Sequence, residues 1–450
     1  MNRLQSYTRI LYLLVPLLLL TVQLRGQASD NRSLVLSLEE AMEIALEQNF
    51  DIEQAANEAD KSRAQYRQTS AVFLPQLSFE YNAVSTNDPL NVFGFKMKQQ
   101  SVTEQDFIPA SLNDPGSYEN YSAAFEIRQP LFNPDMISQR SAVKHQLKSS
   151  NEQLQGTKNY IRYQVQKQYF SLVLYNRQLQ VIESALQTAG EHRRQAQHFL
   201  DEGMISKEDY LAARVYELEM ESRKLNTENE RTEVEENLAL LMGFDGSNVI
   251  VPSDSLQLKP APRFTENDPA IDVNNAQTRA IDYRVRAAEQ MVKSSDFSFL
   301  PKINLFGSYE YNDNDIAGFG ASSYMIGANL RWNIFSGLSK AGKSMEARAD
   351  LRQAQSMQQN HRFEQENRVR RAVRALEHAE KELELTDESI RQSTEAVKIR
   401  SNRYAQGMEK TTDLLEAETK LAEAKLQNVM ALFKHNMSIA ALNLLLETNL

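Results

Sequence analysis

The residue types that most often carry catalysis are sparse and scattered in this chain. It has no cysteine, which excludes disulfides, thiol catalysis and a lipidated N-terminal cysteine. It has six histidines, and His192 and His198 lack the i, i+4 spacing of a helical metal pair. No phosphate-binding loop, nucleophile elbow or zinc motif is present. The sequence therefore predicts neither an enzyme nor a cofactor or metal site.

One arrangement of acidic residues and glycines occurs twice. Gly203-Met204 is followed by Asp209, and Gly407-Met408 is followed by Asp413 at the same spacing. A glycine at such a position most simply ends a helix in the left-handed conformation. An acid in the first turn of the next helix complements its positive end, which is worth about 0.3 to 1 kcal/mol. We expect two helix turns, each with an acid beside it.

These turns belong to longer repeated units. Phe73-Leu74-Pro75 returns as Phe299-Leu300-Pro301, and Pro130-Leu131-Phe132 corresponds to Asn333-Ile334-Phe335. The markers keep their order, so each half of the chain is predicted to consist of a helix, two strands and a long helix pair. Neither half can complete its sheet alone, which points to an assembly.

Long helices are expected from the near absence of helix breakers. No proline occurs between Asp135 and Val251 or after Pro301, and Ala, Leu, Glu, Gln and Arg fill these stretches. We predict long helices over 138–200 and 340–403, each followed by a return helix of about 36 residues, roughly 55 Å long. Shorter helices over 38–71 and 272–297 should stack end to end with the return helices, and Ser37 to Glu40 forms a capping box.

A seven-residue hydrophobic repeat predicts supercoiled packing of these helices. Its clearest run consists of Val369, Leu376, Leu383, Ile390, Val397 and Tyr404. A hollow helical barrel and a solid coiled coil in a secreted scaffold protein without a pore both fit this pattern.

Four segments alternate between apolar and polar residues, as strands do when one face meets lipid and the other water: 77–83, 121–128, 303–312 and 323–332. A soluble half-buried sheet gives the same pattern. However, an open edge in a membrane leaves backbone groups unpaired, and closed barrels need about 8 strands. The barrel would therefore be shared between subunits. Four aromatic residues near the strand ends could form an interfacial girdle or pack between helix and sheet: Phe73, Phe132, Phe299 and Phe335.

The N-terminus and the charge of the chain bear on its location. Residues 1–28 read as a signal peptide, because Arg3 and Arg9 precede the apolar run Ile10 to Leu20 and small residues follow. The formal net charge is -10 without a basic stripe, which argues against nucleic-acid binding. An exported chain is expected.

Taken together, the ordered motifs resemble the TolC-like outer-membrane efflux proteins. The resemblance rests on the opening Leu36 to Ala41 with Ala45, Leu46 and Asn49, on the two Phe-Leu-Pro strand starts, and on the two glycine turns. It implies a mostly α fold with β: four transmembrane strands per chain in a shared trimeric β-barrel, and long antiparallel coiled helices that form a periplasmic α-barrel. The domains would be the signal peptide, a first repeat over 29–245, an equatorial linker over 246–270 and a second repeat over 271–450.

The resemblance also implies a function and partners. The chain would be the outer-membrane channel of a multipart efflux or type I secretion system in a Gram-negative bacterium. It would act as a homotrimer with a periplasmic membrane-fusion adaptor and an inner-membrane pump of the RND, ABC or MFS type. The sequence does not indicate the cargo.

Site residues follow from matched positions only. The resemblance implies gate carboxylates at Asp413 and Glu416, a gate latch formed by Tyr404 and Asp209, and helix-tip turns at Gly203 and Gly407 that contact the adaptor. Three copies of the carboxylates would focus a negative potential and favour cations. The chain departs from the family pattern at Glu409, where a basic residue is usual. A glutamate does not pair with Asp209, so the latch here is expected to be different or weaker.

Overall fold

The computed structural model describes residues 33–245, 249–260 and 273–448. The chain divides into two compact units. The hairpin unit comprises residues 1–47, 165–256 and 393–429, and the sheet unit comprises 48–164, 257–392 and 430–450. Each unit contains parts of both predicted repeats. The predicted signal peptide lies outside the described residues, as does much of the predicted linker.

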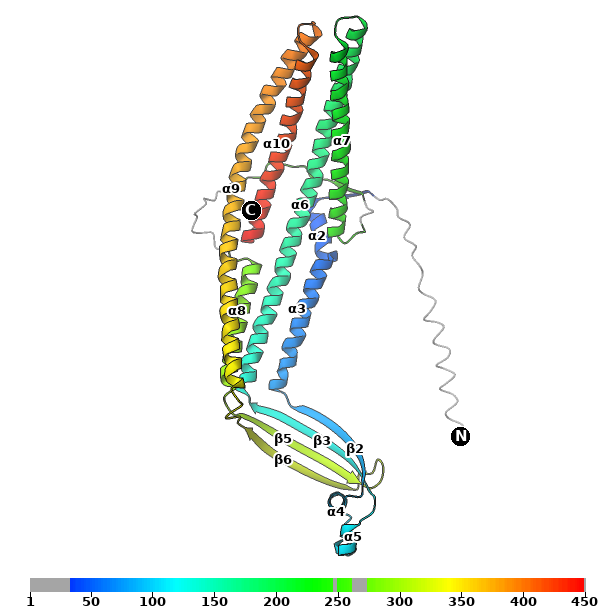
Figure 1. Ribbon diagram of the computed structural model, residues 1–450, viewed down its shortest axis with the longest axis vertical. Coiled ribbons are helices and arrows are strands. Elements are labelled where there is room, and N and C mark those ends of the chain that lie inside the picture. The colour runs from blue at the N-terminus through cyan, green and yellow to red at the C-terminus, as the bar shows by residue number, and fades with distance from the viewer. Residues whose placement is uncertain (1–32, 246–248, 261–272, 449–450) are drawn as a thin grey trace, which may run out of the picture. The chain divides into compact units, whose positions relative to one another are not determined.

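Four antiparallel strands in the order β2-β3-β5-β6 form the sheet of the sheet unit (Figure 1). They span Gln76–Thr86, Tyr118–Phe132, Lys302–Asp313 and Ala321–Arg331. The four predicted strands are thus confirmed. Within the described part of the chain, the outer edges of β2 and β6 have no strand partner.

The strand register places apolar and polar residues on opposite faces. Phe79, Phe125, Tyr309 and Tyr324 face one another across the four strands and form an aromatic row on one face. The rings of Phe79 and Phe125 lie 4.9 Å apart. The positions one residue further along hold Glu80, Ala124, Glu310 and Ser323, on the other face. We call these the apolar face and the polar face; Leu305 and Leu330 belong to the apolar one.

The loop between β2 and β3 contains helices of its own. α4 (Pro89–Lys98), η2 (Glu104–Phe107) and α5 (Pro109–Asn113) lie within it. Both α-helices start at a proline, whose missing N–H and fixed φ suit the first helical position. Pro89 and Pro109 therefore begin helices.

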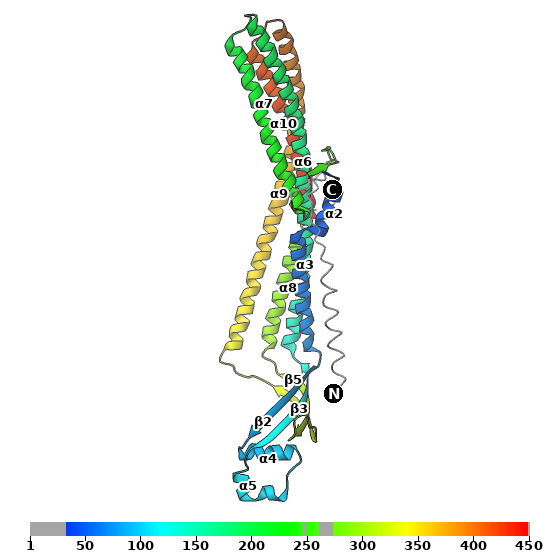
Figure 2. The ribbon, with the colours of Figure 1, turned by 90° about the vertical axis from the view of Figure 1, so that its right-hand side faces the viewer.

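The long helices match their predicted lengths. α6 spans Pro134–Asp201 (68 residues) and α9 spans Ser339–Ala405 (67 residues), so each is roughly 100 Å long. The return helices are α7 (Lys207–Leu241, 35 residues) and α10 (Thr411–Leu446, 36 residues). The order strand, strand, long helix, return helix thus occurs twice. Figures 1 and 2 both show α7 beside α6.

The predicted helix over 38–71 is wrong in one respect, because it is divided. α2 (Leu38–Gln48) and α3 (Phe50–Gln68) are separated at Asn49, and η1 (Thr69–Val72) follows. The Asn49 Oδ1 accepts hydrogen bonds from the backbone N–H groups of Asp51 (2.9 Å) and Ile52 (3.2 Å), which starts a new helix. The Ser37 capping box is confirmed, with Ser37 Oγ 2.7 Å from Glu40 Oε2.

Two short strands pair in parallel in the hairpin unit: β1 (Ser33–Leu36) and β4 (Val249–Pro252). They were not predicted, and β4 lies within the predicted linker. In the sheet unit, α8 (Ala276–Phe297) begins where α10 ends, since Asn275 Nδ2 donates to the Leu445 carbonyl at 3.1 Å. This contact confirms the predicted stacking for the second repeat.

Each unit has its own apolar core. In the hairpin unit, alanines at 189, 196 and 213 pack with Tyr216, Met220 and Leu415. In the sheet unit, Val369, Val373 and Leu376 of α9 pack against Ile439 and Leu442 of α10. Among the described helices, α10 alone is long and apolar enough by composition to cross a membrane, and its Leu415, Ile439 and Leu442 pack in these cores.

Candidate functional site

The two helix turns of the hairpin unit share one backbone geometry. Gly203 and Gly407 have φ values of +73° and +69°. The Gly407 N–H bonds to the Tyr404 carbonyl (3.0 Å) and the Met408 N–H to that of Arg403 (2.9 Å), and the turn at Gly203 repeats the pattern. A β-carbon at either glycine would meet no neighbouring atom within 4 Å. The left-handed backbone, and not crowding, therefore explains the glycines.

Asp209 caps the helix in which it lies. Its Oδ2 accepts hydrogen bonds from the Ser206 N–H (3.2 Å) and hydroxyl (2.7 Å), while the Ser206 Oγ accepts from the Asp209 N–H. This reciprocal capping box begins α7. The carboxylate thus has a local structural role whatever else it does.

Tyr404 is buried at the end of α9 and packs against Phe199 of α6, with ring centroids 5.7 Å apart. Its hydroxyl accepts a hydrogen bond from Thr411 Oγ1 at 3.3 Å. Burial raises the pKa of Tyr404, and the nearby Asp209 carboxylate raises it further. In the described residues the two predicted latch partners thus bond to other groups, Tyr404 to Thr411 and Asp209 to Ser206.

Glu409, the departure from the family pattern, finds its partners on α9. Its carboxylate lies 3.4 Å from Arg400 Nη1 and 3.1 Å from Arg403 Nε, and its side chain is only 9% exposed. Arg400 Nη1 also donates to the Asp413 carbonyl at 2.9 Å. These contacts tie the end of α9 to the start of α10. Sequence reasoning missed both arginines, although Arg403 lies in the last turn of α9, where basic residues are favoured.

The predicted gate carboxylates lie on the first turns of α10 and differ in their surroundings. Glu416 is exposed and pairs with Lys420 Nζ at 2.6 Å. That hydrogen bond holds the pKa of Glu416 below its usual value. Asp413 is partly exposed and has no ion-pair partner among the described residues. Lys420 was missed, although its i, i+4 spacing from Glu416 is that of a helix pair.

A small hollow lies between α9 and α10 beside these groups. It measures about 130 Å³, and Arg400, Glu416 and Lys420 are among the residues that line it. The surface near the turn therefore carries both signs of charge. Asp413 and Glu416 favour cation binding there, whereas Arg400 and Lys420 oppose it.

A second polar contact joins α6 to α10 within the hairpin unit. His192 Nε2 lies 3.3 Å from Glu418 Oε1, and the two side chains are 12% and 14% exposed. Burial raises the pKa of the adjacent Tyr216 to about 12, and the Glu418 charge adds to this effect. Sequence reasoning considered His192 only as a metal ligand and missed this interhelical partner.

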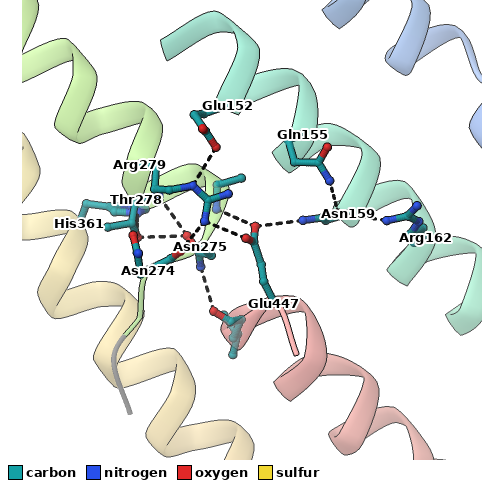
Figure 3. Close-up of polar contacts among 12 residues, drawn as sticks. Glu152, Gln155, Asn159, Arg162, Asn274, Asn275, Thr278, Arg279, His361 and Glu447 are labelled. Atoms are coloured by element: carbon teal, nitrogen blue, oxygen red, sulfur yellow. Dashed lines mark hydrogen bonds and ion pairs between the residues drawn. The ribbon is translucent and has the colours of Figure 1, made fainter. Parts of the chain in front are cut away.

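The sheet unit holds a polar cluster at the junction of three helices. Figure 3 shows Arg279 between two carboxylates, with Nε 2.9 Å from Glu152 and Nη1 2.9 Å from Glu447. Glu447 also accepts hydrogen bonds from the Ala276 N–H (2.6 Å) and Asn159 Nδ2 (2.9 Å). It therefore fixes the end of α10 to the start of α8 and to α6. A cavity of about 820 Å³ lies beside the cluster, and Asn159 and Glu447 are part of its lining.

The comparisons with known proteins assign this arrangement to a family. The family model described as "Outer membrane efflux protein" matches residues 41–244 and 270–446, most of the chain. The chain belongs to the outer membrane efflux protein family. The resemblance to TolC-like proteins is thereby confirmed. No curated protein sequence matches the chain.

Solved structures share the fold of this outer membrane efflux protein. A membrane protein from Pseudomonas aeruginosa superposes with a TM-score of 0.80 at 17% identity, covering 92% of this chain and 93% of that one. The Campylobacter jejuni CmeC outer membrane channel gives a TM-score of 0.79 at 16% identity, covering 91% and 85%. CusC, described by its transmembrane channel formation, gives 0.78 at 17% identity, covering 92% and 93%.

Family membership settles the broad class of this protein. It is a channel protein of the outer membrane, with its helices in the periplasm, and not an enzyme. The sheet suits this location in the outer membrane, because one of its faces is apolar enough for lipid and the other is polar. A secreted scaffold without a pore would leave this two-faced sheet without a purpose.

The four predicted girdle aromatics of this efflux protein are all exposed: Phe73, Phe132, Phe299 and Phe335. Basic groups lie beside two of these rings. The Arg140 guanidinium is 5.7 Å from the ring centroid of Phe73, and the Lys340 ammonium is 5.7 Å from that of Phe299. Phe132 ends β3, whereas Phe335 lies beyond the end of β6. Exposed aromatic rings beside cations are typical of a membrane–water interface, so the girdle remains our prediction.

Proposed function

We propose that three copies of this chain form the outer-membrane duct of a multipart efflux or type I secretion system. The observation that carries this proposal is the sheet with two unpaired edges and one apolar face. Unpaired backbone groups in hydrocarbon cost several kcal/mol each, so β6 of one copy must pair with β2 of the next. Four strands per copy are too few to close a barrel of about 8 strands or more, and three copies are sufficient.

The helix turns support a partner in the periplasm. Both turns expose a methionine directly after the glycine, Met204 and Met408. Exposed flexible apolar side chains beside an irregular backbone suit a protein contact. We assign this surface to a periplasmic membrane-fusion adaptor, which would link the channel to an inner-membrane pump of the RND, ABC or MFS type. Gly203 and Gly407 would contribute the shape of the turn.

The same end of the hairpins would form the gate. In a trimer, Asp413 and Glu416 would recur three times around the axis and attract cations. Lys420 offsets one of these charges in each copy, because it pairs with Glu416. The contacts of Glu409 with Arg400 and Arg403 would hold the end of α9 against the start of α10 at the gate, and a latch between Tyr404 and Asp209 remains part of the proposal.

Gel mobility tests the shared barrel directly. The mature protein, extracted from outer membranes in mild detergent, should migrate as a trimer without heating and as a monomer after boiling. A chain that migrates as a monomer in both conditions would contradict the shared barrel. A soluble chain recovered without membranes would instead favour the secreted scaffold.

A further inference from the structure

The loop over residues 87–117, which we call the outer loop, is a folded body in its own right. Val92 of α4 is buried, and the rings of Phe93 and Phe107 lie 5.7 Å apart. Lys96 and Asp106 form an ion pair whose side chains are 25% and 12% exposed. The Lys96 hydrogen bond and those from Thr103 lower the pKa of Asp106 to about 2. The loop therefore keeps its internal contacts over the ordinary pH range.

This body docks on the sheet through the end of α4. Lys98 Nζ lies 3.1 Å from Glu310 Oε1 of β5, and Gln99 Nε2 donates to Asn120 Oδ1 of β3 at 2.8 Å. Asn120 Nδ2 in turn donates to Asn312 Oδ1 at 3.0 Å, and both asparagines are almost fully buried. α4 contacts β3 and β6, so it crosses the intervening β5.

All three of these sheet residues lie on the polar face. Glu310 shares the row of Glu80, and Asn312 lies two residues further along β5. Asn120 lies on the same face of β3 as Ser122 and Ala124, because side chains two residues apart in a strand share a face. Ser122 pairs with Asn312 and Ala124 with Glu310. The aromatic row lies on the opposite face. The outer loop is thus fixed to the side of the sheet that does not meet lipid.

From this placement we propose that the outer loop forms a second constriction inside the outer mouth of the barrel, anchored by Lys98 on Glu310. This inference rests on the proposed trimeric channel, because the polar face becomes the lumen only when the barrel closes. The loop leaves Leu90, Phe107 and Ile108 exposed. Three copies would bring such side chains into the mouth, and apolar constrictions restrict ion flow by dewetting.

The anchor sets how often the constriction opens. The Lys98 and Glu310 side chains are 52% and 27% exposed, so their ion pair is a partly solvated one. Loss of such a pair shifts the equilibrium between docked and undocked loop by about two- to fivefold. The loop would open more often and the channel would pass more current while it is open.

Single-channel recording of the full-length trimer in a planar bilayer tests this inference. Lys98→Glu should raise the frequency of higher-conductance events about two- to fivefold. Glu310→Lys should do the same, and the double variant with exchanged charges should return to the wild-type frequency. Glu104→Gln is the matched control, because Glu104 is exposed on the same loop and makes no ion pair among the described residues.

Each outcome separates the inference from the channel on which it rests. A conducting wild type whose record is unaltered by either single variant would overturn the second constriction and leave the channel intact. If both single variants raise the frequency of higher-conductance events and the double variant with exchanged charges does not restore it, the Lys98–Glu310 anchor would be overturned. A wild type that inserts as a trimer and never conducts would contradict the channel itself.

Discussion

The charge around the helix turns predicts how ion selectivity responds to single substitutions. In each copy, Asp413 and Glu416 each contribute one negative charge and Lys420 one positive charge. These groups sum to three net negative charges in a trimer, and Glu409 with Arg400 and Arg403 adds three positive charges nearby. Asp413→Asn makes the charge of the ring more positive by three, whereas Lys420→Gln makes it more negative by three. The two variants should shift selectivity in opposite directions.

The size of the effect follows from Coulomb's law. A unit charge about 8 Å from a passing ion contributes roughly 0.5 kcal/mol in water, so three contribute roughly 1.5 kcal/mol. The effect has opposite sign for cations and anions, which doubles the difference between them. Screening at about 0.15 M salt, where the Debye length is ~8 Å, reduces it roughly threefold. The cation-to-anion permeability ratio should therefore change about five- to tenfold.

Reversal potentials in asymmetric KCl measure this ratio. Asp413→Asn should lower the cation-to-anion permeability ratio and weaken block by divalent cations. Lys420→Gln should raise the ratio and strengthen this block. Glu423→Gln is a suitable control, because Glu423 is exposed further along α10 and lies 3.6 Å from Arg223. Equal permeability ratios in correctly assembled Asp413 and Lys420 variants, or shifts in the same direction, would refute the acidic gate.

Further predictions concern the barrel and the sheet unit. Ile326→Arg places a charge on the apolar face and should reduce the yield of heat-sensitive trimer in outer membranes, because such a charge costs about 2 to 4 kcal/mol at mid-bilayer. Met325→Arg on the polar face should be tolerated, and equal trimer yields from the two variants would contradict the assigned faces. Glu447→Ala removes the carboxylate that binds Arg279 and the first N–H of α8, so it should lower the free energy of unfolding by about 2 kcal/mol. An unchanged midpoint of unfolding in urea would count against the cluster in Figure 3. Burial lowers the pKa of His361, so the native state binds the proton less tightly than the unfolded chain, and the stability that His361 contributes is complete above the unfolded pKa and is lost as pH drops through the folded pKa. His361→Gln should therefore lose less stability than the wild type below about pH 6.5. An acid sensitivity of unfolding that His361→Gln leaves unchanged would be inconsistent with that assignment.

The parts of the fold that depend on local patterns were predictable. Strand alternation, the long helices and the two glycine turns follow from the period of the hydrophobic residues and from the placement of glycine and proline. The break at Asn49 was missed because the helical pattern continues through it without glycine or proline. The pairing of β1 with β4 was missed because it joins segments more than 200 residues apart, and local periodicity does not report such contacts.

The candidate site shows the same division. Lys420 and the arginines beside Glu409 lie near their partners in the chain, so their spacing could have revealed them. The contact of His192 with Glu418 and the cluster at Arg279 join residues far apart in sequence. Such pairs depend on how the helices pack, and only the structure reveals them.

A pore with an acidic constriction has a distinctive conductance. The decisive measurement is the single-channel conductance of the purified full-length mature trimer, recorded in a planar bilayer with and without millimolar divalent cation. Such a pore should give small, cation-selective conductance steps that divalent cations block and that lose much of this block in Asp413→Asn. Well-inserted trimers that show anion-selective steps, or steps unaffected by divalent cations, would contradict the acidic gate, and trimers that never conduct in any variant would contradict the pore.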